Sequence, residues 1–381
     1  MIRLTTQATL LLTLLTSCGQ DYEFLPDNPN VHPGDVTECD FTRVGTTPFY
    51  EYGCNPVFST TGENWAETIK STAFLVTEVM GHPFYQLWYS GVVDENQLGE
   101  FGLGYAISPD GTKWEANLAN PLLEEPASSA WDGSSMDAMQ VVWDPTTQQY
   151  VMLYQGYNLD NNPSTWGLGV ATSTDGREWV RLPYNPVVDF TNSSPSDPRW
   201  CWPLGLTLGE VAGFTGYVGG SEAGSQKCEV YPINAGDVTQ WNPSQNKVYA
   251  AGPAGSFDDE GFTSLAIAEL DGIHYMFYVG FSDWQNFATY STTLNHSLGW
   301  ATSTDGRNWT RGLIPEAAIS GISQEAGPLQ LRESETGVIS HVAAHRVDNR
   351  IHMWVTDEWD GNQAVGYYLF DPQRAEEEDA Q

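Results

Sequence analysis

Three groups of acidic residues stand where a carboxylate could do acid–base chemistry. Asp137 interrupts an apolar stretch, Met-Asp-Ala-Met. Glu325 lies in Ser-Gln-Glu-Ala-Gly-Pro, and Asp259 and Glu260 end a short acidic run. Cleavage of a glycosidic bond would need such groups in pairs, because one protonates the leaving oxygen while another activates water. The alternative is structural, since acidic residues beside turns and strands often accept hydrogen bonds from backbone N–H groups.

Other residues could bind a ligand beside these carboxylates. Trp200, Trp202 and Trp284 are substrate-binding candidates, because an indole face stacks on the C–H face of a sugar ring. Lys70 occupies the corresponding position in an earlier repeat and is a fourth candidate. The alternative for the tryptophans is packing between sheets, which is expected for four others: Trp114, Trp179, Trp241 and Trp309.

A sequence repeat defines the elements that must position these residues. Each copy has alternating residues up to a serine, which predicts a half-buried strand, then Asp-Gly, which predicts a tight turn, then a tryptophan on the returning strand. A fourth copy keeps the tryptophan but has lost Asp-Gly. The copies cover residues 102–114, 167–179, 230–241 and 298–309.

Further strands flank each copy and complete a repeating unit. A strand rich in aromatic residues precedes each copy, near residues 84, 150, 214 and 274, and another lies near residue 351. The presumed innermost strands begin near Thr72, Met139, Leu204, Leu265 and Leu329. Four strands in each of five units predict an all-β fold, a five-bladed β-propeller. Residues 41–58 are expected to close the ring by completing the last blade, which otherwise ends at residues 366–370.

An alignment of the blades indicates which side chains lie near the propeller axis. The alignment uses the aromatic residues before each inner strand, and it gives Asp258 the turn role that Asp132 has in the second blade. His341 and His345 fall on one face of a late strand, where a solvated or core pair is favoured. The axial triplets of blades one to five are residues 70–72, 136–138, 200–202, 262–264 and 324–326.

The blade pattern resembles a known superfamily. Tyr-x-Met-x-Tyr-x-Gly, then Gly-x-Ala-x-Ser-x-Asp-Gly-x-x-Trp, then Asn-Pro is similar to the five-bladed propellers of the furanosidase and arabinanase-like glycoside hydrolases, families 32, 43, 62, 68 and 130. The resemblance implies a general base, a general acid and a pKa-tuning carboxylate on the inner strands, with Asp137 in the tuning position. Blades one and three depart from it, so either Glu67 and Asp197 stand in or the catalytic set is incomplete.

These observations lead to one leading hypothesis and two alternatives. The first is a glycoside hydrolase acting on arabinose- or xylose-type or β-mannosidic linkages, with Asp137, Glu325 and Asp259 or Glu260 sharing the catalytic roles. The second is a non-catalytic glycan-binding propeller. The third is a structural surface protein with no small ligand.

The N-terminal segment predicts export and a lipid anchor. Residues 1–17 combine one early positive charge with an apolar run too short to span a bilayer, which is typical of a signal peptide. Leu-Thr-Ser-Cys18 looks like a lipobox, so Cys18 is expected to be acylated, with outer-membrane or cell-surface placement. The alternative is an ordinary secretory peptide. The expected order is then a tether (18–38), the propeller (39–374) and an acidic tail (375–381).

Cysteine count and charge set further limits. Four cysteines remain after Cys18, and their order suggests the disulfides Cys39–Cys54 and Cys201–Cys228. No cysteine spacing matches a zinc site, so no cofactor is expected to be required, with Ca²⁺ as an optional ligand. A formal net charge of −34 with only 15 Lys and Arg argues against nucleic-acid binding. The expected partners are a carbohydrate and, through the lipid alone, a membrane.

Overall fold

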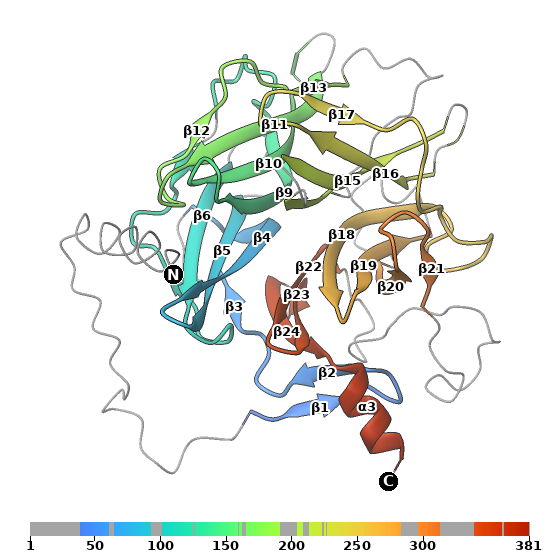
Figure 1. The fold of residues 1–381 in the computed structure, drawn as a ribbon. Coiled ribbons are helices and arrows are strands. Elements are labelled where there is room, and N and C mark those ends of the chain that lie inside the picture. The colour runs from blue at the N-terminus through green and yellow to red at the C-terminus, as the bar shows by residue number, and fades with distance from the viewer. Residues whose placement is uncertain are drawn as a thin grey trace, which may run out of the picture.

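The chain forms five antiparallel sheets arranged around a central axis, as Figure 1 shows. This computed structural model describes residues 39–60, 65–92, 101–124, 126–158, 160–161, 165–190, 204–208, 213–222, 225, 227–282, 296–312, 339–359 and 362–380. The five inner strands contact one another in a closed ring. The predicted five-bladed β-propeller is confirmed.

The first four blades have four strands each in radial order, counted from the axis outward. Short additional strands pair with the third strand in blades one and two. Blade one contains β4 (Thr68–Val79), β5 (His82–Val92), β6 (Phe101–Ser108), β7 (Glu115–Ala116) and the additional β8 (Leu123–Glu124). Blade two contains β9 (Ser135–Asp144), β10 (Gln149–Asn158), β11 (Thr165–Ser173), β12 (Val180–Arg181) and the additional β13 (Val188–Asp189). Blade three contains β14 (Leu204–Leu208), β15 (Phe214–Gly220), β16 (Glu229–Ala235) and β17 (Trp241–Pro243). Blade four contains β18 (Gly261–Leu270), β19 (Ile273–Phe281), β20 (Ser297–Ser303) and β21 (Thr310–Arg311).

Blade five joins the two ends of the chain. Its strands, from the axis outward, are β22 (His341–Val347), β23 (Arg350–Trp359), β24 (Asn362–Phe370), β2 (Phe49–Tyr52) and β1 (Phe41–Arg43), and β3 (Phe58–Ser59) also pairs with β24. The N-terminal segment therefore closes the ring as predicted. One predicted position is wrong: the inner strand of blade five begins at His341 and not near Leu329.

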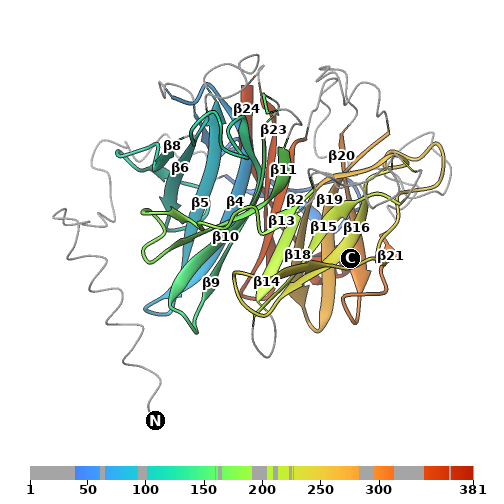
Figure 2. The ribbon, with the colours of Figure 1, turned by 90° about the horizontal axis from the view of Figure 1, so that it is seen from above.

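The strands run between two faces of the propeller, which Figure 2 shows from the side. We call the face at which β4, β9, β14, β18 and β22 begin the top face, and the opposite one the bottom face. The Ser-x-Asp-Gly turns follow the third strands and so lie toward the bottom face. In the first of them, Asp110 accepts hydrogen bonds from the backbone N–H groups of Thr112 and Lys113 at 2.8 and 2.9 Å. Gly111 has a φ of +79°, which a side chain would disfavour.

These turns also join neighbouring blades. The indole N–H of Trp88 in blade one donates to the carbonyl of Gly176 in blade two at 2.7 Å. Trp354 in blade five donates likewise to Gly111 in blade one at 3.1 Å. The hydroxyl of Tyr217 in blade three donates to Gly306 in blade four at 2.6 Å. Each Asp-Gly turn thus receives a bond from the second strand of the blade before it.

The equivalent second-strand positions in the other blades carry no polar donor. Strand register places Leu153 and Phe277 where the other blades have Trp88, Tyr217 and Trp354. Leu153 precedes the blade whose turn has lost Asp-Gly, and Phe277 precedes blade five, which ends in the N-terminal strands. A donor is therefore present only where an acceptor turn follows it.

Removal of one of these donors gives a direct test of the joint. Tyr217→Phe deletes the hydroxyl and leaves the partly buried Gly306 carbonyl without that partner, which is expected to lower the free energy of unfolding by about 1 kcal/mol. Urea unfolding followed by circular dichroism measures the loss. The control is Tyr184→Phe, because Tyr184 is 49% exposed. Equal stability of the two variants would contradict a role for the joint.

The ring closure is fastened at the top face by a disulfide. Cys39 and Cys54 are bonded, with their Cα atoms 5.4 Å apart, which confirms this predicted pair. The side-chain oxygen of Asn55 accepts the N–H of Tyr367 on β24 at 2.7 Å. Cys228 is buried and disulfide-bonded, while its predicted partner Cys201 lies outside the described residues.

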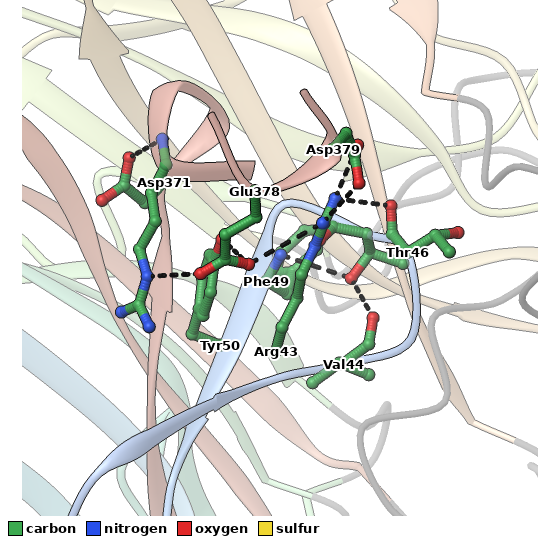
Figure 3. A network of polar contacts seen from close by, with 10 residues as sticks. Arg43, Val44, Thr46, Phe49, Tyr50, Asp371, Glu378 and Asp379 are labelled. Carbon is green, nitrogen blue, oxygen red and sulfur yellow. Dashed lines mark hydrogen bonds and ion pairs between the residues drawn. The ribbon is translucent and has the colours of Figure 1, made fainter. Parts of the chain in front are cut away.

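The same closure is fastened at the bottom face by helix α3 (Pro372–Asp379), which contains most of the acidic tail. Figure 3 shows Arg43 of β1 bound to Asp379 by two hydrogen bonds of 2.7 and 3.0 Å. The Tyr50 hydroxyl donates to Glu378 at 3.1 Å, and Asp371 caps the helix by accepting the N–H of Arg374 at 3.0 Å. Helix α3 therefore binds the β1–β2 hairpin through Arg43 and the Tyr50 hydroxyl.

Candidate functional site

A β-bulge occurs at the same place on three inner strands, near the top face. On β4, Ile69 pairs with Gly91 and Ser71 with Ser90, so Lys70 is the additional residue. On β9, Asp137 pairs with Gln155 and Met139 with Tyr154, so Ala138 is the additional residue. On β18, the same irregularity falls at Thr263. Bulges are frequent beside active sites, where they redirect side chains.

The bulges align three pairs of residues around the axis. Strand register makes Lys70-Ser71, Asp137-Ala138 and Thr263-Ser264 equivalent, each pair facing one residue of the second strand. We call these pairs the top positions. They match the axial triplets that the sequence predicted for blades one, two and four.

Each top position with a described serine uses that serine to hold the next blade. The Ser71 hydroxyl accepts the N–H of Met139 at 3.2 Å, and the Ser264 hydroxyl accepts the N–H of Val342 at 3.2 Å. The other residue of each pair stays without a partner. Thr263 is only 6% exposed and its hydroxyl makes no hydrogen bond. Lys70 is half-buried and has no hydrogen bond or ion pair with any residue that the structure describes.

The top position of blade five belongs to a histidine. His341 pairs with Thr356, which corresponds to Ser90 and Gln155, so the predicted alignment of Glu325 with this strand is wrong. The alignment failed because blade five lacks the aromatic-acidic motif that precedes β9 and β18. Glu325 itself lies outside the described residues, as do Trp200, Trp202 and Trp284, and so does Cys18. Asp137 lies in the β9 bulge, but its side chain is outside the described part.

The acidic pair before β18 has a structural geometry. A carboxylate oxygen of Asp259 accepts the N–H of Gly255 at 2.7 Å, and its backbone carbonyl accepts the Lys227 ammonium at 2.6 Å. The backbone N–H of Glu260 donates to Phe281 at 3.2 Å. The bond from Gly255 is that of the turn-capping alternative, while the other carboxylate oxygen of Asp259 is buried without a hydrogen bond. Both residues lie before the bulge, and their catalytic assignment stays a prediction.

Two other carboxylates are fully buried and form matching clusters. Asp132 in blade two accepts the Tyr154 hydroxyl at 2.9 Å and lies 3.5 Å from the Arg181 guanidinium. Burial raises the pKa of the Asp132 carboxyl, while Tyr154 and Arg181 oppose that rise. In blade four the corresponding residues Asp258, Tyr278 and Arg311 make the same contacts. The predicted equivalence of Asp258 and Asp132 holds in this geometry.

Blade one has lost both charges of this cluster together. Ala66 and Ala116 occupy the positions of the acidic residue and the arginine. The Tyr89 hydroxyl still accepts a hydrogen bond from Asn120 at 3.0 Å, as the Tyr154 hydroxyl of blade two does from Asn185 at 3.3 Å. The joint loss indicates that the two charges serve each other. The Asp132 and Asp258 carboxylates therefore have a structural role, as the buried partners of the arginine in the same blade.

The two predicted histidines lie on one strand, as expected. His345 bonds through Nε2 to the Phe74 carbonyl at 2.7 Å. Nδ1 of His341 is buried without a hydrogen-bond partner. Burial lowers the pKa of both to about 4, so both are neutral at neutral pH.

Sequence reasoning missed Asp357 because it considered inner strands alone. Asp357 on β23 is 5% exposed and takes the position that glycine holds in blades one, two and four. The sequence does contain a signal for Asp357. Blade five has Asp-Glu-Trp at the place where those blades have a glycine followed by an apolar residue. Thr263 was within the predicted triplet, but only the strand register shows that it is equivalent to Lys70.

No group of three or more His, Cys, Asp or Glu among the residues that the structure describes could hold a metal ion. Ca²⁺ therefore stays a prediction. In the same part of the chain, no helix is long and apolar enough to cross a membrane.

Comparisons with known proteins give the fold a context. No protein-family model and no curated protein matches the sequence. Solved structures do match. One belongs to the GH130 family of mannoside phosphorylases, which contains glycoside hydrolases that target β-1,2-mannosidic linkages in Candida mannan: 16% identity, TM-score 0.57, 90% of this chain and 97% of that one. A glycosyl hydrolase from Bacteroides ovatus has 16% identity and a TM-score of 0.54, and the match covers 90% of this chain and 93% of that one. An N-acetylgalactosamine deacetylase from F. plautii has 12% identity and a TM-score of 0.58, and the match covers 88% of this chain and 96% of that one.

These matches confirm the fold resemblance that the sequence suggested. At such identities they show the architecture alone. The reactions named for the matching proteins differ, so the chemistry of this chain has to be argued from its own top positions.

Proposed function

We propose that this chain is a carbohydrate-active propeller protein whose top face carries the site, and that it hydrolyses glycosidic bonds of the arabinose, xylose or mannose type. The observation that carries the proposal is the β9 bulge. In this bulge, near the top end of the inner strand β9, Asp137 has the same register position as Lys70 and Thr263. Carboxylates on inner strands are what the resembling glycosidases use, and the glycosidases among the structural matches favour a sugar substrate.

In this proposal the remaining predicted residues keep their assigned roles. Asp137 and Glu325 share the catalytic work with Asp259 or Glu260. Three tryptophans bind the sugar: Trp200, Trp202 and Trp284. Export and an anchor on acylated Cys18 place the domain on the cell envelope. Incorporation of labelled palmitate that is lost in Cys18→Ser would support the anchor.

A specific observation favours a second candidate, a glycan-binding propeller without catalysis. The top positions of blades one and four carry Lys70 and Thr263, so neither offers a carboxylate. If no second carboxylate reaches the axis, water cannot be activated opposite a proton donor. Binding would then remain as the function.

The deciding experiment measures sugar release by the purified full-length protein on a panel of polysaccharides and aryl glycosides. Asp137→Asn is expected to lower release by about 10²–10⁴-fold, since it removes a proton-transferring or tuning group. The matched control is Asp144→Asn, at the other end of β9, where Asp144 accepts hydrogen bonds within a turn. Release that Asp137→Asn leaves unchanged would exclude Asp137 from the site. Binding without release, in folded protein, would establish the second candidate.

A further inference from the structure

Lys70 differs from the other partly buried basic residues that the structure describes. Every other half-buried Lys or Arg in that part of the chain contacts a carboxylate, a carbonyl or an aromatic ring: Arg43, Arg177, Arg181, Lys227, Lys247, Arg311 and Arg374. Lys70 contacts none of these. The chain has 49 acidic residues for 15 basic ones, so a partner for one more cation was abundantly available.

Burial removes part of the hydration of a cation, which is costly where no partner replaces it, and none of the residues that the structure describes is such a partner for Lys70. A lysine can reduce that cost by extending its ammonium group to solvent. The top face is the place where such an extension would put the charge, since Lys70 stands in a bulge at the axial end of β4.

The same end of the axis holds other polar groups that lack partners. Thr263, in the equivalent position of blade four, has a buried hydroxyl with no hydrogen bond. His341, in the equivalent position of blade five, has a buried Nδ1 with none. Lys70, Thr263 and His341 therefore each have a polar group with no hydrogen-bond partner among the described residues, and only Lys70 is a cation at neutral pH.

We propose that the top face recognises a sugar that carries a negatively charged group, a carboxylate or a sulfate, and that Lys70 binds this group. The inference rests on the proposed carbohydrate function and names its substrate class. The net charge of −34 does not oppose it at short range, because charges on the distant surface are screened beyond about 10 Å at 0.1 M salt. A direct contact between an ammonium group and an anion is screened much less.

The experiment compares ligands that differ in charge alone. Calorimetry at 0.1 M salt measures binding of the full-length protein to polygalacturonate and to its methyl ester, and to dextran sulfate and dextran. The wild type is expected to prefer an acidic form over its neutral counterpart by about tenfold, the effect of one charged hydrogen bond. Lys70→Met, which keeps the length of the side chain, should lose the preference. Lys70→Arg should retain it.

The control variant is Lys113→Met, in the exposed turn of the same blade. A preference that survives Lys70→Met, or that Lys113→Met abolishes equally, would overturn the assignment to Lys70. Equal binding of acidic and neutral sugars would overturn the inference while the proposed function stands. Binding to no sugar at all, in protein with the wild-type circular dichroism spectrum, would overturn the proposed function and the inference with it. A preference for carboxylate over sulfate, or the reverse, would identify which anion is recognised.

Discussion

Asp258→Ala is expected to lower the free energy of unfolding by about 3–5 kcal/mol, because it leaves the half-buried Arg311 without its anionic partner. The Asp258 carboxylate is fully buried and accepts hydrogen bonds from the Tyr278 hydroxyl at 3.1 Å and the Ser256 hydroxyl at 2.8 Å. The substitution therefore removes one acceptor from Arg311 and from each of the two hydroxyls at once. Urea unfolding is the measurement, with Glu269→Ala, an exposed acidic residue of the same blade, as the control.

A double variant separates the unpaired charge from the lost packing. Asp258→Ala combined with Arg311→Met removes both charges, as blade one does with Ala66 and Ala116. Replacing a buried ion pair by apolar groups is often nearly neutral, so the double variant should be more stable than Asp258→Ala by at least about 1 kcal/mol. A double variant less stable than the single one would show that packing, and not the unpaired charge, dominates the loss.

Acidification from pH 6.5 to pH 4 is expected to destabilise the fold steeply. Burial lowers the pKa of His296 from 6.5 to about 4, and the pKa values of His341, His345 and His352 fall to about 4 for the same first reason. A histidine with a folded-state pKa below its unfolded value stabilises the fold fully above the unfolded pKa. That contribution is lost as the pH falls toward the folded pKa, because the unfolded chain binds the proton first.

The size of this effect can be tested on one residue. His296 is 7% exposed, and a shift from 6.5 to about 4 corresponds to about 3 kcal/mol. His296→Gln cannot take up a proton, so the fall in unfolding free energy between pH 6.5 and pH 4 should shrink by about that amount. The control is His82→Gln, at the exposed first residue of β5, which should not reduce the fall. A wild-type stability that is flat across this window would contradict the prediction.

The sequence predicted the blades because each carries its own local signals. Strand alternation, the Asp-Gly turn and the following tryptophan are all set within a few residues, and the N-terminal closing strand shares their pattern. The inner strand of blade five was misplaced because the sequence before it lacks the aromatic-acidic motif by which the other blades were aligned.

The candidate site was less predictable than the fold, because its geometry depends on pairing between distant strands. Lys70 could be named from the sequence, but its equivalence to Thr263 follows from bulges that only strand register reveals. The hydrogen bond between Tyr217 and Gly306 and the ion pair between Asp258 and Arg311 likewise link residues that are far apart in the sequence. A comparison of the blades could have predicted such pairs, because a blade that lacks one residue of a pair also lacks the other.

The direction of β1 determines how an anchored molecule would be held. β1 runs parallel to the inner strand β22, so Cys39 lies at the top face and the disulfide holds it there. Cys39, the first residue that the structure describes, therefore lies on the same face as the site proposed above. If Cys18 carries the lipid, the 21 residues from Cys18 to Cys39 reach at most about 70 Å when fully extended. A lipid on Cys18 would then keep Cys39, and with it the top face, within about that distance of the membrane.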